Sequence, residues 1–533
     1  MTSSRTVQRL ADRMKLSDRE VVVQRTFPPE LEKERRAIEE VARQEGLDFF
    51  ETIFEILDFD QLNQVAAYGG FPQRYPHWRF GMEYERLRKQ HSYGLGRIYE
   101  MVINNDPCYA YLLADNDFVD QKTVMAHVYA HCDFFKNNVW FSKTNRKMMD
   151  GMANHATRIQ RHIEREGAET VERFIDVCLS LENLIDPYLP FMKRQDENRR
   201  PPRITLREQV EQRVVRFPAK PYMDRYINPP ERLAAERERE EKAVQSRKRA
   251  FPAQPERDVL LFLLHHAPLE DWQADILDII RDEAYYFAPQ AQTKIMNEGW
   301  ATYWHSRLMT RYHLRDHELI TYADHHSGTL ATAPGRLNPY KLGVELFRDI
   351  EDRWNRGRFG KEYEECESIE QRRTWDRKLG LGKEKIFEVR RVHNDVTFID
   401  EFLTPEFVDR FKLYHYRMDP ATGRMVVVNR DFKTIKQTLL FMLTNHGDPY
   451  IYIVDGNYAN RGELYLAHKH IGMDLDLKYA AETLRNLHLL WRRPVHLQAR
   501  IKDDMLLLSC DGDNVKQQKI RDDLPKPAHS LVA

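Results

Sequence analysis

Two short stretches of the sequence carry residues whose types and spacing could bind a metal ion. "HVYAH" places His127 and His131 four residues apart, so on a helix both imidazoles share one face and can reach one ion. "NEGWATYWH" sets Glu298 among aromatic residues that predict burial, and a buried carboxylate needs a cation or metal as partner. Two histidines and a glutamate form one known type of catalytic zinc site, in which the metal activates water and polarises a carbonyl. The alternatives are polar pairing of the histidines in a helical core and a glutamate that faces the helix dipole.

Other residues near these motifs are predicted to support the site rather than bind the metal. His305 follows Glu298 by seven residues, which is about 10.5 Å along an ideal helix, so one ion cannot bind both. We therefore expect His305 to lie behind the ligands, to contact substrate or to stabilise an oxyanion. Glu283 is a possible general base, on a separate helix because Pro289 should break or kink the pattern. "DHHSG" adds His325 and His326 as secondary candidates.

Two further histidine patterns are weaker. A di-iron bundle requires Glu-x-x-His pairs, and no histidine in the sequence has a glutamate three residues before it. "HKH" at 468–470 alternates on an expected strand, so both rings point to one face, and we expect a surface or interface role.

Composition excludes several classes of protein. The 533 residues include 82 Lys plus Arg against 83 Asp plus Glu, which leaves no basic footprint for nucleic acid or an anionic membrane. The five cysteines show no C-x-x-C spacing, which indicates reduced thiols. The longest apolar runs, 259–264 and 438–443, fall far short of the roughly 20 residues that span a bilayer. We expect a cytoplasmic protein.

The periodicity of the chain predicts which elements position these residues. Residues 29–66 read as helix, 68–87 as a loop rich in Gly, Pro and aromatics, and 90–185 as further helix broken at 104–109 and 136–140. Helix returns at 258–385. Strands are expected at 450–454, 463–468, 494–500 and 505–509, with helices at 431–447 and 476–491. The expected regions are an N-terminal extension (1–28), a helical region with HVYAH (29–186), a charged, proline-rich connector (187–257), a helical region that packs with the first as one domain (258–385), a C-terminal α+β domain (386–515) and a tail (516–533).

Four long motifs resemble the SpoVR family, which takes its name from a stage V sporulation protein. They are "YGGFPQRYPHWRFGMEYERL", "SYGLGRIYEMVINNDPCYAYL", "HVYAHCDFFKNN" and "MNEGWATYWH", and the resemblance extends from about residue 29 to 515. It implies a cytoplasmic bacterial protein linked to the peptidoglycan cortex of the spore, or to a broader stress response. It also implies an AAA+-type serine protein kinase and a von Willebrand A-like protein as partners in the same pathway.

A looser resemblance bears on the chemistry. "NEGWA" is similar to the "NEGFA"-type segment of gluzincin metallopeptidases, which implies that Glu298 is a third zinc ligand beside His127 and His131. Val128, however, stands where the catalytic glutamate of those enzymes belongs. The chain is therefore expected to be mainly α, with a large helical zincin-like domain followed by a small C-terminal α+β domain. Two functions remain open: a zinc-dependent hydrolase of peptidase or amidase type, with Glu283 as base, or a non-catalytic scaffold in a kinase-linked pathway.

Overall fold

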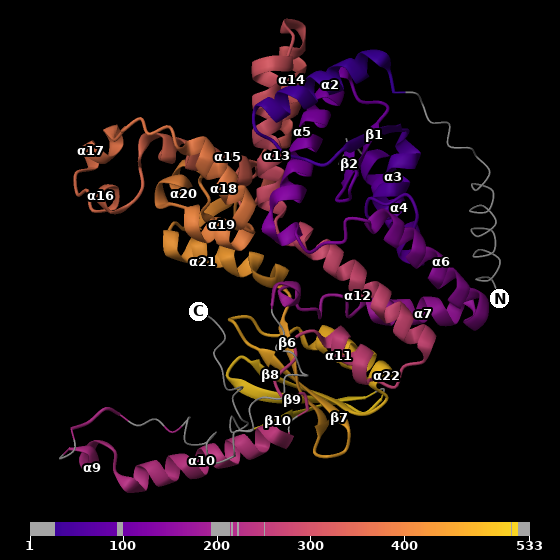
Figure 1. Cartoon of the computed structure of the whole chain (residues 1–533), viewed down its shortest axis with the longest axis vertical. Helices are drawn as coiled ribbons and strands as arrows, with labels where there is room; N and C mark the ends of the chain where they lie inside the picture. The colour runs from indigo at the N-terminus through magenta and orange to yellow at the C-terminus, as the bar shows by residue number, and fades with distance from the viewer. Residues whose placement is uncertain are drawn as a thin grey trace. The chain divides into compact units, whose positions relative to one another are not determined.

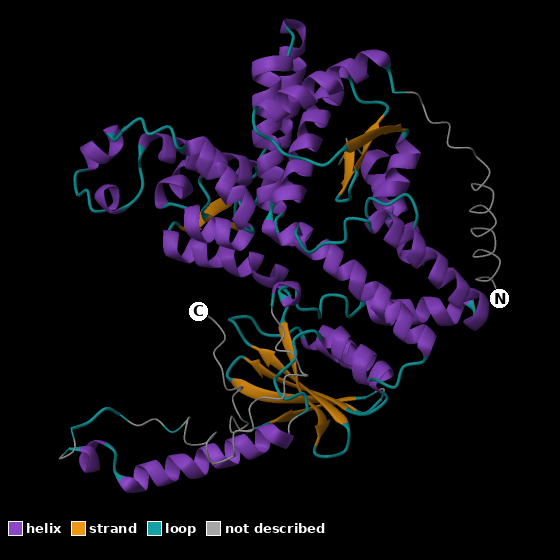
Figure 2. Ribbon diagram, viewed as in Figure 1, coloured by secondary structure: helices purple, strands orange, loops and turns teal. Residues whose placement is uncertain are grey.

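The computed structural model describes residues 27–92, 100–192, 214, 217–220, 223–249, 251–512 and 514–520 (Figure 1). Helices dominate, and the strands form a three-stranded, a five-stranded and a two-stranded sheet (Figure 2). The predicted fold class, mainly α with a small C-terminal α+β domain, is confirmed. The chain forms two compact units. The first comprises Met1–Gln160 and Thr293–Leu440, and the second comprises Arg161–Gln292 and Phe441–Ala533.

The first unit contains a small sheet that the sequence reading missed. β1 (Thr52–Leu57) pairs in parallel with β3 (Cys108–Leu113), and β2 (Glu100–Ile103) pairs with β3 in the antiparallel sense. The helices predicted over 29–66 and 90–185 are therefore wrong at these strands. A short apolar run has no periodicity that separates a strand from a buried helix. The helices in this part of the chain are α2 (Pro29–Gln44), α3 (Phe59–Ala67), α4 (Trp78–Ser92), α5 (Phe118–Asn137) and α6 (Met148–Glu166), of which the residues from Arg161 on belong to the second unit. Because α4 begins at Trp78, the loop predicted over 68–87 is also too long.

Two helices form the centre of this unit. α5 is buried along almost its whole length, as is α13 (Lys294–Leu308). α13 crosses α15 (Pro339–Arg356) at a pair of glycines. A Cβ built on Gly299 would lie 2.8 Å from the backbone nitrogen of Val344 and closer still to the backbone of Gly343. The two backbones therefore touch, and glycine is required where they do.

Buried carboxylates fix the position of α13. Asp133 of α5 accepts a hydrogen bond from Trp300 Nε1 at 2.8 Å and lies 3.4 Å from Arg390 Nε. Asp395, the first residue of α19 (Asp395–Phe402), accepts hydrogen bonds from the backbone N–H groups of Ile295 and Met296 at 2.8 and 2.9 Å. These N–H groups belong to the first turn of α13, which has no partner for them within the helix. The remaining elements of the unit are α14 (Leu319–Thr329), α16 (Lys361–Glu364), α17 (Ile369–Thr374), α18 (Gly382–Val392), α20 (Pro405–Phe411), β4 (His415–Met418), β5 (Met425–Asn429) and most of α21 (Phe432–Leu443).

The second unit contains the five-stranded sheet, in the order β10-β9-β8-β7-β6. β7 and β8 are parallel and are connected by α22 (Leu477–Trp491), whereas the other neighbours are antiparallel. The strands are β6 (Tyr450–Tyr458), β7 (Glu463–Lys469), β8 (Val495–Ile501), β9 (Asp504–Cys510) and β10 (Val515–Lys519). The four predicted strands and the helix at 476–491 are confirmed. The other helices are α7 (Ala168–Leu179), α9 (Asp224–Ile227), α10 (Pro230–Arg249), α11 (Val259–His266) and α12 (Asp271–Gln292).

The division into units differs from the predicted domain boundaries. Residues 161–186 and 258–292 were expected beside the HVYAH region, but they belong to the unit that holds the large sheet. Residues 386–440 were assigned to the C-terminal domain, but their helices belong to the first unit. The tail was expected from residue 516, yet β10 continues to Lys519. Pro289 lies inside α12, which ends only at Gln292, so the break expected at the proline occurs at Thr293. Residues 1–26 of the extension, 193–213 of the connector and 521–533 of the tail lie outside the described residues.

Candidate metal centre

His127, His131 and Glu298 converge in space. Each offers one ligand atom, and these atoms all lie within 4.8 Å of one another. Glu298 Oε2 lies 3.6 Å from Nε2 of His127 and 3.6 Å from Nε2 of His131. Ligand atoms on zinc bonds of about 2.0–2.2 Å stand roughly 3.3–3.6 Å apart in a tetrahedron. The three side chains, from α5 and α13, thus have the donor types and nearly the spacing of a zinc site.

The far nitrogen of each histidine is engaged, which leaves Nε2 for the centre. His131 Nδ1 lies 2.9 Å from the amide oxygen of Asn297, to which it donates. His127 Nδ1 lies 2.9 Å from His305 Nδ1, and His305 Nε2 lies 3.1 Å from His326 Nδ1. Partners of this kind fix the tautomer and the orientation of a ligating ring. His305 therefore lies behind His127, and its catalytic role stays a prediction.

Two further side chains approach the centre, and the sequence reading identified neither. Glu100, the first residue of the edge strand β2, places Oε1 4.0 Å from Nε2 of His127. Tyr340, in the first turn of α15, makes a hydrogen bond with Glu298, and its ring stacks near His127 with centroids 6.4 Å apart. The glycine crossing of α13 and α15 explains the second contact, because Gly343 follows Tyr340 by one helical turn and Gly299 follows Glu298 directly.

Burial and neighbouring groups shift the pKa values of Glu298 and Glu100 in opposite directions. Burial opposes the charge on Glu298, but the hydrogen bond with His127 and the field of His131 outweigh it and lower the pKa of Glu298 to about 2. Burial, reinforced by the charge of Glu298, raises the pKa of Glu100. Burial lowers the pKa of His131 to about 4 and the pKa of His305 well below its usual value. Two carboxyl groups whose pKa values are driven apart are a common arrangement for an anionic ligand beside an acid or base.

A cavity of about 790 Å³ opens beside the centre, within the first unit. Its lining includes Glu100, His127, His305 and Tyr340, so a molecule in the cavity would reach the centre directly. This volume lies within the range of small-molecule sites.

Both secondary candidates, His325 and His326, also line this cavity. His127, His305 and His326 form a chain of hydrogen-bonded histidines, which ends at His326. His325 Nδ1 instead pairs with Asp120 Oδ1 at 2.5 Å. Of these two secondary candidates, His326 is therefore linked to the centre and His325 is not.

Glu283 is the one predicted site residue that belongs to the second unit. It is buried in α12 and belongs to the second unit, whereas the centre belongs to the first. It is not among the residues that line the cavity. As predicted, Glu283 and Glu298 are on different helices. Of the residues that were missed, Asn297 had a signal in its position directly before Glu298, whereas Glu100 and Tyr340 are brought in by β2 and α15 and had none.

The chain resembles known proteins along most of its length. It is a largely helical protein with one candidate metal centre in its described residues. The family described as SpoVR like protein matches residues 26–448, and the SpoVR-like C-terminal domain matches residues 449–502. The chain belongs to the SpoVR family.

One relative is of similar length. The protein described as uncharacterized protein YcgB, from Escherichia coli (strain K12), is 30% identical over 503 residues, which cover 88% of this chain and 92% of the relative. No solved structure matches the chain. Among the described helices, none combines the length and apolar character that crossing a membrane requires.

Proposed function

We propose that this SpoVR-family chain is a zinc-dependent hydrolase that cleaves peptide or amide bonds at the centre formed by His127, His131 and Glu298. The observation that carries the proposal is the convergence of three ligand atoms of the right chemical types beside a cavity large enough for a substrate. The two histidine side chains are less than a tenth exposed, so their approach to one carboxylate is not a chance surface contact.

The residues of the centre fit a zinc ion. Neutral imidazole nitrogens and an ionised carboxylate are the donors that zinc prefers, and three protein ligands leave a position for water or substrate. When bound there, zinc would supply a Lewis acid that polarises a carbonyl and makes water a better nucleophile. The hydrogen bonds to Asn297 and His305 hold the two rings with Nε2 toward Glu298.

Glu100 is the residue best placed to act as the general base. Val128, which replaces the glutamate of H-E-x-x-H, is fully buried and has no proton to exchange. Glu100 approaches the same centre from β2 and lines the cavity, and burial raises its pKa above the ordinary value of a glutamate. Its Oε1 would accept the proton of the attacking water. The Tyr340 hydroxyl donates its one proton to the Glu298 carboxylate and so holds this ligand in place.

The setting of this activity follows from the family. The name of the family supports a role in spore formation, and the substrate class would then be the peptide or amide bonds of peptidoglycan in the spore cortex, or of cell-wall material during stress. An AAA+-type serine protein kinase and a von Willebrand A-like protein are the proposed partners in that pathway, and the proposed location is the cytoplasm.

A second function is favoured by one observation. Val128 removes the usual base, so a metal site that only stabilises a scaffold in the kinase-linked pathway would have the same three ligands. The two functions differ in what Glu100 does. In a hydrolase it is needed for turnover but not for metal binding, whereas in a scaffold its loss has no effect on any reaction.

Metal analysis followed by an activity assay tests the proposal. We expect the purified chain to hold one zinc per molecule, and His127→Ala and Glu298→Ala each to lose it. Unchanged metal content in both variants would end the three-ligand proposal. Peptides and peptidoglycan fragments are then screened for hydrolysis, where we expect Glu100→Gln to keep zinc and lose about 100-fold or more in kcat. Glu283→Gln, in the other unit, is the matched control, and loss of activity in that variant alone would return the role of base to Glu283.

A further inference from the structure

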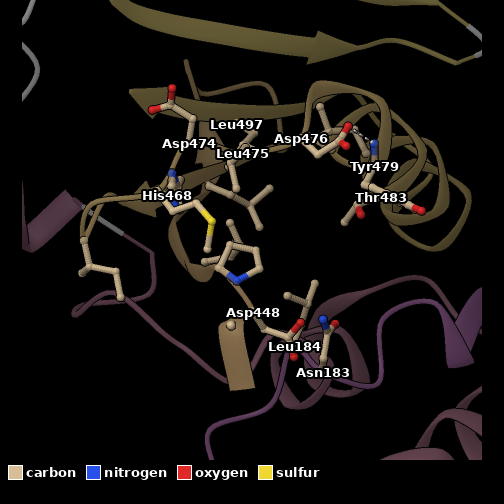
Figure 3. A pocket seen from close by; sticks show the side chains of 18 of the residues that line it. Asn183, Leu184, Asp448, His468, Asp474, Leu475, Asp476, Tyr479, Thr483 and Leu497 are labelled. Atoms are coloured by element: carbon tan, nitrogen blue, oxygen red, sulfur yellow. Dashed lines mark hydrogen bonds between the residues drawn. The ribbon is translucent and has the colours of Figure 1, made fainter. Parts of the chain in front are cut away.

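A second cavity lies wholly within the second unit and has no part in the proposed hydrolysis. Its volume is about 430 Å³, which is within the range of sites for small organic ligands. Figure 3 shows Asn183, Leu184 and Asp448 on one wall, across the space from His468 and Leu497. α22 contributes a further wall through Tyr479 and Thr483.

The interior of this cavity is apolar and rigid. Leu466, Leu484, Leu487 and Leu497 line it and are each less than a twentieth exposed, because they also form the core between α22 and the sheet. Apolar side chains at the rim remain open to solvent, and Met473 is 49% exposed. A ligand with a hydrocarbon or aromatic body would cover both sets, at about 25 cal/mol for each Å² removed from water.

The charged groups around the cavity are all acidic. Asp448, Asp474 and Asp476 line it, and none of its lining residues, all of them in the described part of the chain, is a lysine or arginine. Asp476 caps the N-terminus of α22 by accepting from the backbone N–H of Lys478, and Asp474 accepts from the backbone N–H of Lys502. Both of these carboxylates thus have structural partners.

Asp448 differs from the other two acids. Burial raises its pKa, whereas a hydrogen bond with Asn183 and the neighbouring His446 oppose that shift. Burial in turn lowers the pKa of His446, so this partner tends to be neutral. A half-buried carboxylate with so little compensation gains most from a cation on the ligand.

His468 provides a second polar group on the opposite side. Its Nδ1 is buried and makes no hydrogen bond within the described residues. Since a buried imidazole nitrogen without a partner is costly, a ligand group that reaches it would recover that loss. The cavity therefore offers apolar walls, with an anionic contact at one end and an imidazole contact at the other.

We propose that this cavity binds a small amphiphilic amine, with the apolar body against the leucines of α22 and the sheet and the ammonium group paired with Asp448. The site would give the chain a ligand-sensing function separate from the metal centre. The two cavities share no lining residue and each lies within one unit.

Calorimetric titration of the full-length protein tests this site with three matched probes: 4-phenylbutylamine, 4-phenylbutanol and 4-phenylbutyrate. We expect saturable binding of the amine, weaker binding of the alcohol and none of the carboxylate. Asp448→Asn should weaken the amine about tenfold and leave the alcohol unchanged, because only the charge-assisted contact is lost. Asp503→Asn removes an exposed aspartate of the same unit that does not line the cavity, and it should change neither.

A filling variant guards against failure of the first to fold. Ala480→Phe adds a ring from α22 into the cavity and should abolish binding of both amine and alcohol, with folding checked by thermal unfolding. Equal binding of amine and carboxylate, no saturable binding of the amine at millimolar concentration, or an amine affinity unchanged in both Asp448→Asn and Ala480→Phe would overturn the proposal. None of these outcomes bears on the metal centre.

Discussion

The cavity beside the metal centre and the cavity of the second unit differ in the side chains that line them. Beside the metal centre, polar side chains make hydrogen bonds with one another: His131 with Asn297, and His127 with His305. In the second unit the walls are leucines of the core, and the polar groups stand at the ends of the space. The hydrogen bonds beside the metal centre fix the direction of each histidine lone pair, which suits an ion with strict geometry. The leucine walls of the second unit's cavity fix its volume and shape, which suits an organic ligand whose orientation depends on one charge.

The same contrast applies to the two histidine pairs. His127 and His131 are four apart on a helix, whereas His468 and His470 are two apart on and just after a strand, and each spacing puts both rings on one side. The decisive difference is the third residue. Glu298 approaches the first pair from a helix that begins more than 160 residues later. Among the described residues, the second pair shares no such third ligand at metal-binding distance.

The largest effect is expected at the backbone contact between α13 and α15, which positions residues of the metal centre. Gly299→Ala should destabilise the first unit by roughly 2–3 kcal/mol, because the new Cβ meets the backbone of α15, which cannot yield as a side chain would. It should also weaken zinc binding, since Glu298 and Tyr340 flank this crossing. Thermal unfolding and zinc titration measure the two effects.

The matched control is another helical glycine in the same unit. A Cβ on Gly328 of α14 would meet nothing within 4 Å, so Gly328→Ala should be neutral or stabilise by up to about 1 kcal/mol. Equal losses in the two variants would mean that the close crossing of α13 and α15 is not what holds the centre together.

The next effect concerns the histidine chain. His305→Ala should weaken zinc affinity by about 10–100-fold, because His127 loses the partner that fixes its tautomer. His325→Ala is the control: it removes a histidine from the same cavity whose hydrogen bond is to Asp120 instead. We expect its zinc affinity to stay within about threefold of the wild type, and competition with a chromogenic chelator measures both. Comparable losses would show that the cavity as a whole, and not the chain, tunes the centre.

These contacts explain which parts of the site could be predicted from sequence. The spacing of His127 and His131 and the aromatic setting of Glu298 are local patterns, and local patterns identified residues that the fold does bring together. Glu100 and Tyr340 join them through pairing of β2 with β3 and through the crossing of α13 with α15, and no local pattern encodes either contact.

The fold was predictable to a similar degree. The strands of the C-terminal sheet alternate in polarity and were found, as was the overall helical character. β1 and β3 are six-residue apolar strands with buried or half-buried side chains, and they were taken for helix because burial on both faces erases the alternation. The division into units could not be read from the chain, since each unit is assembled from two separate segments.

A smaller effect is expected at the start of α13. Asp395→Asn should cost about 1 kcal/mol above pH 7, where the carboxylate is ionised, because only one of its two acceptor oxygens remains for the N–H groups of Ile295 and Met296. Burial raises the pKa of Asp395 from its usual 3.8 to about 7, so the folded state binds more protons than the unfolded state between these values. The free energy of unfolding of the wild type should therefore fall, relative to the variant, as pH rises from about 4 to 7. Denaturant unfolding at several pH values measures this difference, and a difference that grows with pH would contradict the assignment.

The smallest effect sharpens the comparison between the two cavities, because it is an expected absence of coupling. Asp448→Asn and Ala480→Phe alter only the second cavity, so zinc affinity should stay within about twofold of the wild type, a free-energy change below roughly 0.5 kcal/mol. In the reverse direction, His305→Ala should leave the affinity for 4-phenylbutylamine equally unchanged. Coupling between the two ligands is measured by titrating zinc with and without 4-phenylbutylamine, and the amine with and without zinc. The two shifts must agree in sign and size, since coupling between binding sites is reciprocal. A shift of the zinc affinity by the amine and an equal shift of the amine affinity by zinc would mean that the amine regulates the metal centre.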